Sequence, residues 1–369
     1  MDNRILCIVN SLNHGGAETF LMKIFRQWKK NNSPYEMDFI TTGESKGVYE
    51  DEVEQMGGKI YHVPLRTQHP VKTFFCIYRV IRNHKYHFVL KLCDTPIGVY
   101  DILAARLGSA KITSARSCNS FSKESRIKNI ILQWIRPLFN HLAVVKIAPS
   151  DLAARFTFGA QAVERGDVHF VHNGLDVDVF RYKEKHREDI RREFGLEHNF
   201  VVGHVGRFSP QKNHRFLLSV FSALHAVRND AKLLLVGEGE LEEQLRIEVK
   251  ALGLQNAVIF TGKRADVPAL LSAMDVMVFP SFHEGMPNAV IEAQASGLPC
   301  VIADTITKQA KITDLVTFMP LQASAKEWAD VALNQHGGER ESYAGAVQEQ
   351  GYGISDVAER FARLAFDRD

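Results

Sequence analysis

Two carboxylates, Glu284 and Glu292, lie eight positions apart in the stretch SFHEGMPNAVIEAQASGLPC, residues 281–300. The pattern predicts a strand over 275–279, a loop carrying Glu284, and a helix that begins near Pro287 and carries Glu292 about a turn and a half inside. Backbone N–H groups at a helix start attract phosphate. Carboxylates pair strongly with sugar hydroxyls. The spacing therefore predicts binding of a diphosphate that carries a sugar on either side.

The backbone between the two acids belongs to the same predicted site. It comprises Gly285, Met286, Pro287 and Asn288. Plainer explanations exist for each acid alone: Glu284 complements a helix dipole, or Glu292 is an exposed helix charge. Their joint position favours the binding site.

Two cations, Arg207 and Lys212, lie in the loop GRFSPQKN, which follows a predicted strand ending at Val205. A guanidinium and an ammonium there can neutralise a leaving diphosphate without a metal. In the first half of the chain, Gly15 and Gly16 follow another strand, and Gly16 lets backbone approach a ligand closely. This loop lacks G-x-G-x-x-G, and Gly237-x-Gly239 in GEGELEEQ has no third glycine, which disfavours a dinucleotide-dependent oxidoreductase.

Both halves of the chain begin with a strand, a polar loop and an amphipathic helix. The first helix has apolar residues at Phe20, Leu21, Ile24, Phe25 and Trp28, and further strands and helices alternate after each copy. This alternation predicts an α/β protein with two Rossmann-like parallel-sheet domains facing each other across a cleft. The expected boundaries are 1–172 and 173–354, with a C-terminal helix, 355–369, that packs back on the first domain.

Composition sets further limits on the function. The 369 residues are 45% hydrophobic and 24% charged, as in globular proteins, and apolar runs are too short for a membrane span or a secretory signal. A cytoplasmic protein is expected. Five scattered cysteines form no C-x-x-C pair, and Asp176-Val-Asp178 is interpreted as a hinge feature. Neither a metal site nor a resident cofactor is therefore expected.

Charge is distributed unevenly along the chain. Residues 66–148 hold 14 Lys and Arg against three acids, which suggests a surface facing an anionic partner. Nucleic-acid motifs do not accompany the charge, so an anionic membrane is preferred. Within this segment, residues 121–139 form an amphipathic pattern that suits either a membrane interface or ordinary packing on the chain's own sheet. The apolar face comprises Ile127, Ile130, Ile131, Trp134, Ile135 and Leu138.

These residues sit in a chain that resembles the retaining glycosyltransferase family 4, which has the GT-B architecture, and most closely its bacterial exopolysaccharide and capsule branch. The resemblance covers nearly the whole length. It rests on GGAETFLMKIFR, NGLDVDVF, VGRFSPQKN, LLLVGEGELE, the stretch from FTGKRADVPALL to EAQASGLPCV, and ADTITKQAKITDLV.

The resemblance implies roles for particular residues. Glu284 would contact the donor sugar and the reacting region, Glu292 would hold the ribose, and Arg207 and Lys212 would bind the diphosphate. Residues 285–288 would support the sugar or phosphates. Gly16 would approach the diphosphate from the first domain, and Lys263 and Arg264 would lie near the base.

One segment departs from the family. Where many members carry a His-Ser-His-Asn type segment, this chain reads Ala115-Arg116-Ser117-Cys118-Asn119. Arg116 and Asn119 are then expected to contact the sugar or acceptor, with Arg116 adding positive charge near the phosphates. The departure keeps open an inactive sugar-nucleotide-binding subunit, and a GT-B-fold sugar-nucleotide epimerase is a second alternative.

The favoured prediction is a metal-independent retaining hexosyltransferase. It would move a sugar from a nucleotide sugar, expected to be a UDP-sugar, to a saccharide or polyprenyl-linked acceptor, from the cytoplasm and peripherally on the inner face of the membrane. The sugar, the linkage and the oligomeric state are left open.

Overall fold

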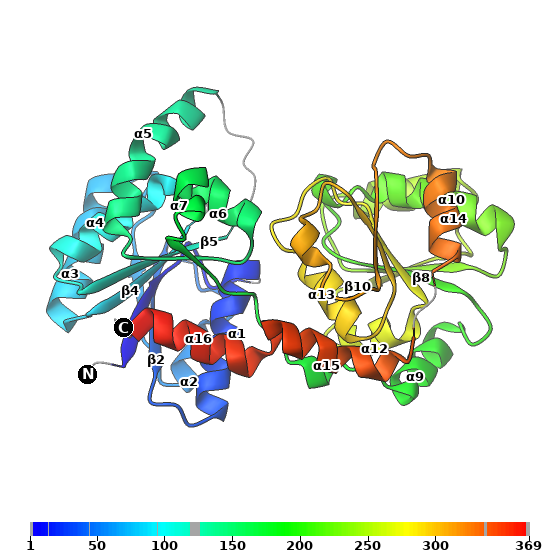
Figure 1. Cartoon of the computed structure of the whole chain (residues 1–369), viewed down its shortest axis with the longest axis horizontal. Coiled ribbons are helices and arrows are strands. Elements are labelled where there is room, and N and C mark those ends of the chain that lie inside the picture. The colour runs from blue at the N-terminus through cyan, green and yellow to red at the C-terminus, as the bar shows by residue number, and fades with distance from the viewer. Residues whose placement is uncertain are drawn as a thin grey trace. The chain divides into compact units, whose positions relative to one another are not determined.

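The structure is a computed structural model. It describes residues 3–13, 15–43, 45–93, 95–118, 126–335 and 338–366, without the side chains of residues 126–130. The chain divides into two compact units (Figure 1). Unit 1 comprises Met1–Gly174 with Ile354–Asp369, and unit 2 comprises Leu175–Gly353. The sequence had placed this boundary two residues earlier.

Unit 1 is built on a seven-stranded parallel sheet in the order β3-β2-β1-β4-β5-β6-β7. In chain order the strands are β1 (Arg4–Ile8), β2 (Glu36–Thr42), β3 (Ile60–Val63), β4 (Phe88–Cys93), β5 (Ile112–Ser117), β6 (Val145–Ala148) and β7 (Val168–Phe170). The helices are α1 (Gly16–Lys30), α2 (Glu50–Gln55), α3 (Pro70–His84), α4 (Val99–Leu107), α5 (Arg126–Leu142), α6 (Asp151–Phe158), α7 (Ala160–Glu164) and α16 (Ile354–Phe366).

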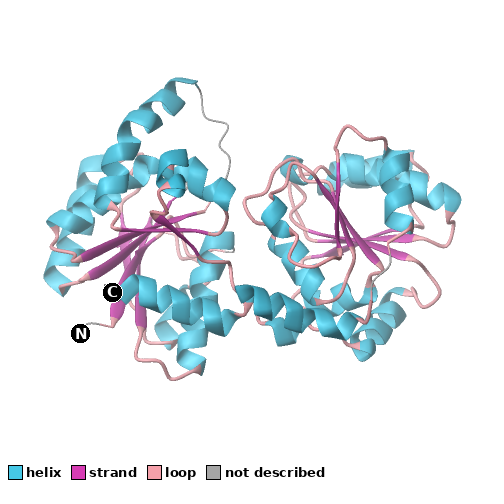
Figure 2. Cartoon of the chain, viewed as in Figure 1, coloured by secondary structure: helices cyan, strands magenta, loops and turns pink. Residues whose placement is uncertain are grey.

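Helices cover this sheet on both faces, as Figure 2 shows. Along β1, Ile5 and Cys7 pack into the cluster formed with α1 and α16, whereas Leu6 and Ile8 pack into the cluster formed with α3 and α4. A parallel strand buried on both sides needs apolar residues at successive positions. This requirement explains the uninterrupted apolar run at the start of the chain.

The C-terminal helix α16 packs on α1, as expected from the sequence. The indole N–H of Trp28 donates to the Ala358 carbonyl at 3.2 Å, and the Phe361 ring lies 5.9 Å from the Trp28 ring. The five apolar positions expected for α1 are all buried. The end of the chain thus completes the core of unit 1.

Unit 2 has a six-stranded parallel sheet in the order β10-β9-β8-β11-β12-β13. In chain order the strands are β8 (Val201–Val205), β9 (Lys232–Val236), β10 (Val258–Gly262), β11 (Val276–Phe279), β12 (Cys300–Ala303) and β13 (Val316–Met319). The helices are α8 (Val177–Phe180), α9 (Glu184–Phe194), α10 (His214–Val227), α11 (Glu242–Ala251), α12 (Val267–Ala273), α13 (Asn288–Ala295), α14 (Ala325–Leu333) and α15 (Tyr343–Val347). Its continuous core runs from α9 to α14.

Helix α5 packs on unit 1, but partly through other residues than the sequence pattern predicted. The residues that α5 turns toward the body of unit 1 are Leu132 and Phe139, which are buried. Three members of the predicted apolar face, Ile131, Trp134 and Leu138, are exposed instead, so these three side chains do not pack on the chain's own sheet. Among the described residues, no helix is both long enough and apolar enough to cross a membrane.

Candidate donor-binding site

The predicted cations and acids of unit 2 follow the carboxyl ends of its strands. The order of strands reverses between β8 and β11, because β9 and β10 extend the sheet to one side of β8 and β12 and β13 to the other side of β11. In open α/β sheets a ligand binds at such a switch point. The loop after β8 carries Arg207 and Lys212, and the loop after β11 carries Glu284.

The structure brings Lys212 and Glu284 into direct contact. The Lys212 ammonium lies 2.7 Å from Oε1 of Glu284 and 4.8 Å from the centre of the Phe279 ring. Glu284 is 8% exposed. An ammonium between a carboxylate and an aromatic face is held in place. The pair therefore offers a fixed cation for a phosphate and a fixed acceptor for a hydroxyl.

Further hydrogen bonds tie the two loops together. The Gln211 side-chain amide donates to the His283 carbonyl at 2.8 Å, and the Phe282 N–H donates to the Gln211 carbonyl at 2.9 Å. Asn213 adopts a left-handed conformation, φ 55°, where the loop turns into α10. Sequence analysis missed Gln211, although a side-chain amide directly before the predicted Lys212 is a signal that could have identified it.

Beneath Lys212 lie two buried histidines that the sequence analysis also missed. The rings of His204 and His214 are 4.6 Å apart, and His204 stacks on Phe279 at 5.1 Å. Burial, followed by the charge of Lys212, lowers the pKa of His214 to about 4. Burial also lowers the pKa of His204. Neutral imidazoles thus form an uncharged floor under the Lys212 ammonium.

The lowered pKa of His214 predicts that the stability of unit 2 depends on pH. Because the pKa of His214 is about 4 in the folded chain and 6.5 ordinarily, the unfolded chain takes up the proton first as the pH falls. Through His214, the free energy of unfolding of unit 2 should therefore fall by about 3 kcal/mol between pH 6.5 and pH 4. Above pH 6.5 the contribution of His214 should be constant. His214→Phe should flatten this slope in urea unfolding, whereas replacing the exposed His198 by Phe should leave it unchanged. Equal slopes in all three proteins would contradict the interpretation.

Arg207 lies on the same loop as Lys212 but does not join the Lys212–Glu284 pair. Its side chain is 74% exposed and lies 3.2 Å from Oε2 of Glu240. A close backbone approach positions this loop, because a Cβ added at Gly237 would lie 2.1 Å from the Gly206 carbonyl oxygen. Gly237 also has φ +139°, which side-chain-bearing residues rarely adopt. The Gly237-x-Gly239 motif therefore has a packing role.

The loop after β10 carries Lys263, which is exposed, and Arg264, which is held in place. The Arg264 guanidinium pairs with Glu193 at 2.7 Å and with Asp266 at 2.6 Å. These hydrogen bonds raise the pKa of Arg264. At the sheet edge this loop lies two strands away from β8.

The loop and helix around Glu292 form largely as expected. Pro287 is the N-cap of α13, and the helix ends where Gly297 adopts φ 61°. Met286 is buried in a cluster with Leu175 and Ile291, so only its backbone is available to a ligand. Glu292 is half-buried within α13. Gly285 precedes α13 and Asn288 is its first residue.

The predicted site residues of unit 1 have different environments. Gly16 begins α1 after β1, and a Cβ added to it would meet nothing within 4 Å. Arg116 is buried in β5, where its guanidinium lies 3.7 Å from the centre of the Phe20 ring and donates to Oδ1 of Asn173 at 2.7 Å. Burial lowers the pKa of Arg116 to about 10. Asn119 lies outside the described residues.

Comparison with known proteins decides the family. Residues 14–179 match the family model described as Glycosyltransferase Family 4, and residues 199–334 match that of Glycosyl transferases group 1. EpsF of Bacillus subtilis (strain 168), named as a glycosyltransferase, is 32% identical over 336 residues, which cover 89% of this chain and 86% of EpsF. The chain belongs to these glycosyltransferases.

One more sequence relative and two solved structures extend the comparison. An Escherichia coli relative is 27% identical over 63% of this chain and 62% of its own length. It is named UDP-Gal:alpha-D-GlcNAc-diphosphoundecaprenol alpha-1,3-galactosyltransferase. The solved structure of Anabaena HepE with UDP and glucose has a TM-score of 0.77 at 20% identity and covers 99% of both chains. WaaG, a glycosyltransferase of lipopolysaccharide biosynthesis, gives a TM-score of 0.71 at 15% identity over 99% of this chain and 100% of its own. The chain has the GT-B fold of this family.

Proposed function

We propose that the protein transfers a hexose from a UDP-sugar, with retention of anomeric configuration, to a saccharide or polyprenyl-diphosphate-linked saccharide during synthesis of a cell-surface polysaccharide. The observation that carries this proposal is the Lys212–Glu284 pair at the switch point of unit 2. Family membership supports it. The UDP-bound HepE structure and the diphosphoundecaprenol named for the Escherichia coli relative support the choice of donor and acceptor.

The proposed chemistry assigns complementary tasks to the pair. The Lys212 ammonium stabilises the diphosphate as the bond between the anomeric carbon and the phosphate oxygen breaks, and Arg207 swings from Glu240 to share that charge. Glu284 accepts a hydrogen bond from a donor-sugar hydroxyl and fixes the sugar's orientation. The acceptor oxygen bonds to the anomeric carbon from the face that the phosphate leaves, and its proton passes to the departing phosphate oxygen. Neither histidine of the family's usual segment is required for this proton transfer.

Glu292 and Gly16 complete the proposed donor site. A half-buried carboxylate on α13 suits the two ribose hydroxyls, and the open space above Gly16 suits a backbone contact with the diphosphate. Lys263 and Arg264 are proposed to lie near the base. Arg116 is proposed to act on the acceptor side through its charge, because its guanidinium is buried.

Peripheral attachment to the inner face of the membrane is also proposed. Helices α3, α4 and α5 cover one face of the unit 1 sheet (Figure 1). Within residues 66–148, Asp101 is fully buried, and Asp94 and Glu124 lie outside the described residues. The described part of this segment therefore exposes cations such as Lys72 and Arg79 without an exposed carboxylate. Exposed apolar side chains beside such cations suit an anionic membrane surface.

A panel of UDP-, GDP- and ADP-sugars tests the donor and the reaction together. UDP-sugars are expected to raise the unfolding temperature and, with a lipid-linked saccharide, to give UDP and an α-linked product. A ligand at 100 times its dissociation constant stabilises by about 2.7 kcal/mol. Binding without turnover would instead indicate an inactive binding subunit, and release of an isomerised sugar would indicate an epimerase. No stabilisation by any nucleotide sugar would refute the proposal.

A further inference from the structure

A cavity of about 500 Å³ lies within unit 1, and its lining residues all belong to that unit. It is bounded by the second half of α5, the strand β6 and the turn before β7. Its polar lining includes Arg136, Asn140, His141, Lys146, Arg165 and Asp167. Lys146 and Asp167 lie at the amino ends of their strands, the opposite end of the sheet from Gly16.

Lys146 is the central feature of this cavity. The residue is 9% exposed, and within the described residues its side chain makes neither a hydrogen bond nor an ion pair. Burial lowers the pKa of Lys146, and the neighbouring charges of Asp167 and Arg165 act in opposite directions on it. A largely buried lysine that shares the charge of Asp167 with Arg165 is incompletely neutralised, which is costly. Such a group lining a cavity indicates that an anion belongs there.

A second cation, which has no carboxylate partner among the described residues, lines the same cavity. Arg136 donates to the Phe156 carbonyl at 3.2 Å, its Nε is buried without a partner, and burial lowers its pKa. Gly159, at φ +89°, keeps room for this side chain, since an added Cβ would lie 3.0 Å from its Cδ. The third cation, Arg165, is neutralised by Asp167 at 2.8 Å. Two positive charges therefore remain to be balanced.

An apolar stripe borders the mouth of the cavity. On α5, the cavity-lining Gln133, Pro137 and His141 recur every four residues. Trp134 and Leu138 each follow a lining residue by one position, so they lie on the adjacent strip of the helix. Trp134 is 82% exposed, and Leu138 and Ile131 are about half exposed. A ligand that fills the cavity with a charged group would place an attached hydrocarbon chain against this stripe.

We propose that the cavity binds the phosphate group of an anionic membrane lipid while Ile131, Trp134 and Leu138 enter the membrane interface. Two uncompensated cations match a phosphomonoester, and the apolar stripe selects a phosphate carried by a lipid over a soluble one. This inference rests on the proposed peripheral attachment and adds a specific headgroup site to it.

Tryptophan fluorescence of the full chain provides the test. Of the three tryptophans, Trp28 and Trp328 are buried and only Trp134 is exposed, so a blue shift on adding vesicles reports on α5. The shift is expected with phosphatidylcholine vesicles containing phosphatidic acid. It should be weaker with phosphatidylglycerol at equal charge and absent with phosphatidylcholine alone. Lys146→Gln should weaken binding to phosphatidic acid vesicles about tenfold, and Lys146→Arg should restore most of it.

Matched controls separate the specific site from general attraction. Lys111→Gln removes an exposed cation of the same unit and should change binding less than twofold. An unfolding curve for each variant checks that unit 1 is intact. Trp134→Ser, which keeps Lys146, should bind the vesicles more weakly than wild type in a flotation assay. Equal lipid binding by Lys146→Gln and wild type would overturn the proposal. So would Lys146-dependent stabilisation by inorganic phosphate without vesicle binding, which would point to a soluble anion.

The same proteins distinguish this inference from the proposed function. UDP stabilisation and donor hydrolysis depend on unit 2, so they should be unchanged in Lys146→Gln. If Lys146→Gln loses the preference for phosphatidic acid vesicles but still binds UDP, the result supports the headgroup site. Vesicle binding without UDP binding would refute the donor proposal alone.

Discussion

Replacing Glu284 by Gln is expected to lower the turnover number for sugar transfer about 100-fold. The substitution keeps the size of the side chain but removes the charge that faces the Lys212 ammonium at 2.7 Å and that is proposed to accept a hydrogen bond from the donor sugar. A charge-assisted hydrogen bond to a buried carboxylate contributes about 1.5–3 kcal/mol, and only the part that strengthens in the transition state changes turnover. Transfer rates at saturating donor measure this effect directly.

Two companion variants show whether Glu284 acts on the sugar or on the nucleotide. UDP lacks the sugar, so the affinity of Glu284→Gln for UDP should stay within about threefold of wild type. Lys212→Gln should weaken UDP binding about tenfold, because it removes the cation that faces the diphosphate. Glu243→Gln, on the first turn of α11, is the matched control for loss of one exposed acid. A turnover number within threefold of wild type in Glu284→Gln would remove Glu284 from the reacting region.

The fold was largely predictable from the sequence because its strands are buried on both faces. The apolar runs MDFITT and FVLKLC predict strands, and they form β2 and β4. The strand β5 was missed because its residues, ITSARS, are mostly polar, yet all six are buried. Contacts with other elements compensate for the burial of these polar side chains. The Ser117 hydroxyl donates to the Ala153 carbonyl at 2.8 Å and lies 2.7 Å from the Thr157 hydroxyl. The Arg116 guanidinium stacks on the Phe20 ring. These contacts join residues far apart in the sequence, so the local pattern of residue types could not predict them.

The candidate site was predictable to a similar degree. Loop positions for Glu284 and Lys212 follow from strand ends, because the carboxyl ends of parallel strands share one edge of the sheet. Their direct contact depends on β8 and β11 being neighbours, which chain order alone conceals. The uncharged state of His204 and His214 depends on burial, and the exposed apolar stripe of α5 depends on which side of the helix meets the sheet.

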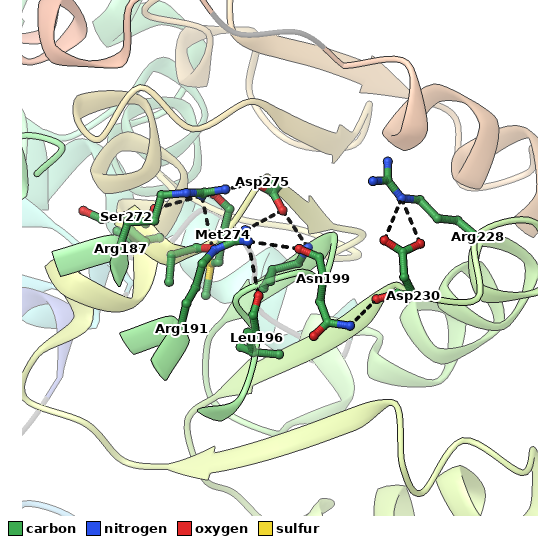
Figure 3. A network of polar contacts seen from close by, with 12 residues as sticks. Arg187, Arg191, Leu196, Asn199, Arg228, Asp230, Ser272, Met274 and Asp275 are labelled. Carbon is green, nitrogen blue, oxygen red and sulfur yellow. Dashed lines mark hydrogen bonds and ion pairs between the residues drawn. The ribbon is translucent and has the colours of Figure 1, made fainter. Parts of the chain in front are cut away.

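Asp275→Asn is expected to destabilise unit 2 by about 3 kcal/mol. Asp275 stands directly before β11, and Figure 3 shows that it is held by two arginines of α9. Arg187 and Arg191 each place Nη2 2.7 Å from one of its oxygens, and the Val201 N–H at the start of β8 donates to Oδ2 at 2.7 Å. The amide cannot balance two partly buried guanidinium groups, so the substitution leaves their charges facing each other. Urea unfolding measures the loss, and hydrogen exchange of peptides spanning β8 and β11 locates it.

The surface pair Arg228–Asp230, also drawn in Figure 3, provides the matched comparison. Its atoms are 3.2 Å apart and both side chains are more than 40% exposed, so Asp230→Asn should cost less than about 1 kcal/mol. The double variant Asp275→Asn with Arg191→Met should recover part of the lost unfolding free energy. Removing both partners of a buried ion pair destabilises less than leaving one buried charge without its partner. Equal effects of Asp275→Asn and Asp230→Asn would show that the arginine clamp does not hold β11 in place. Because β11 leads into the loop that carries Glu284, a loosened strand should also weaken UDP-sugar turnover in proportion to the unfolded fraction.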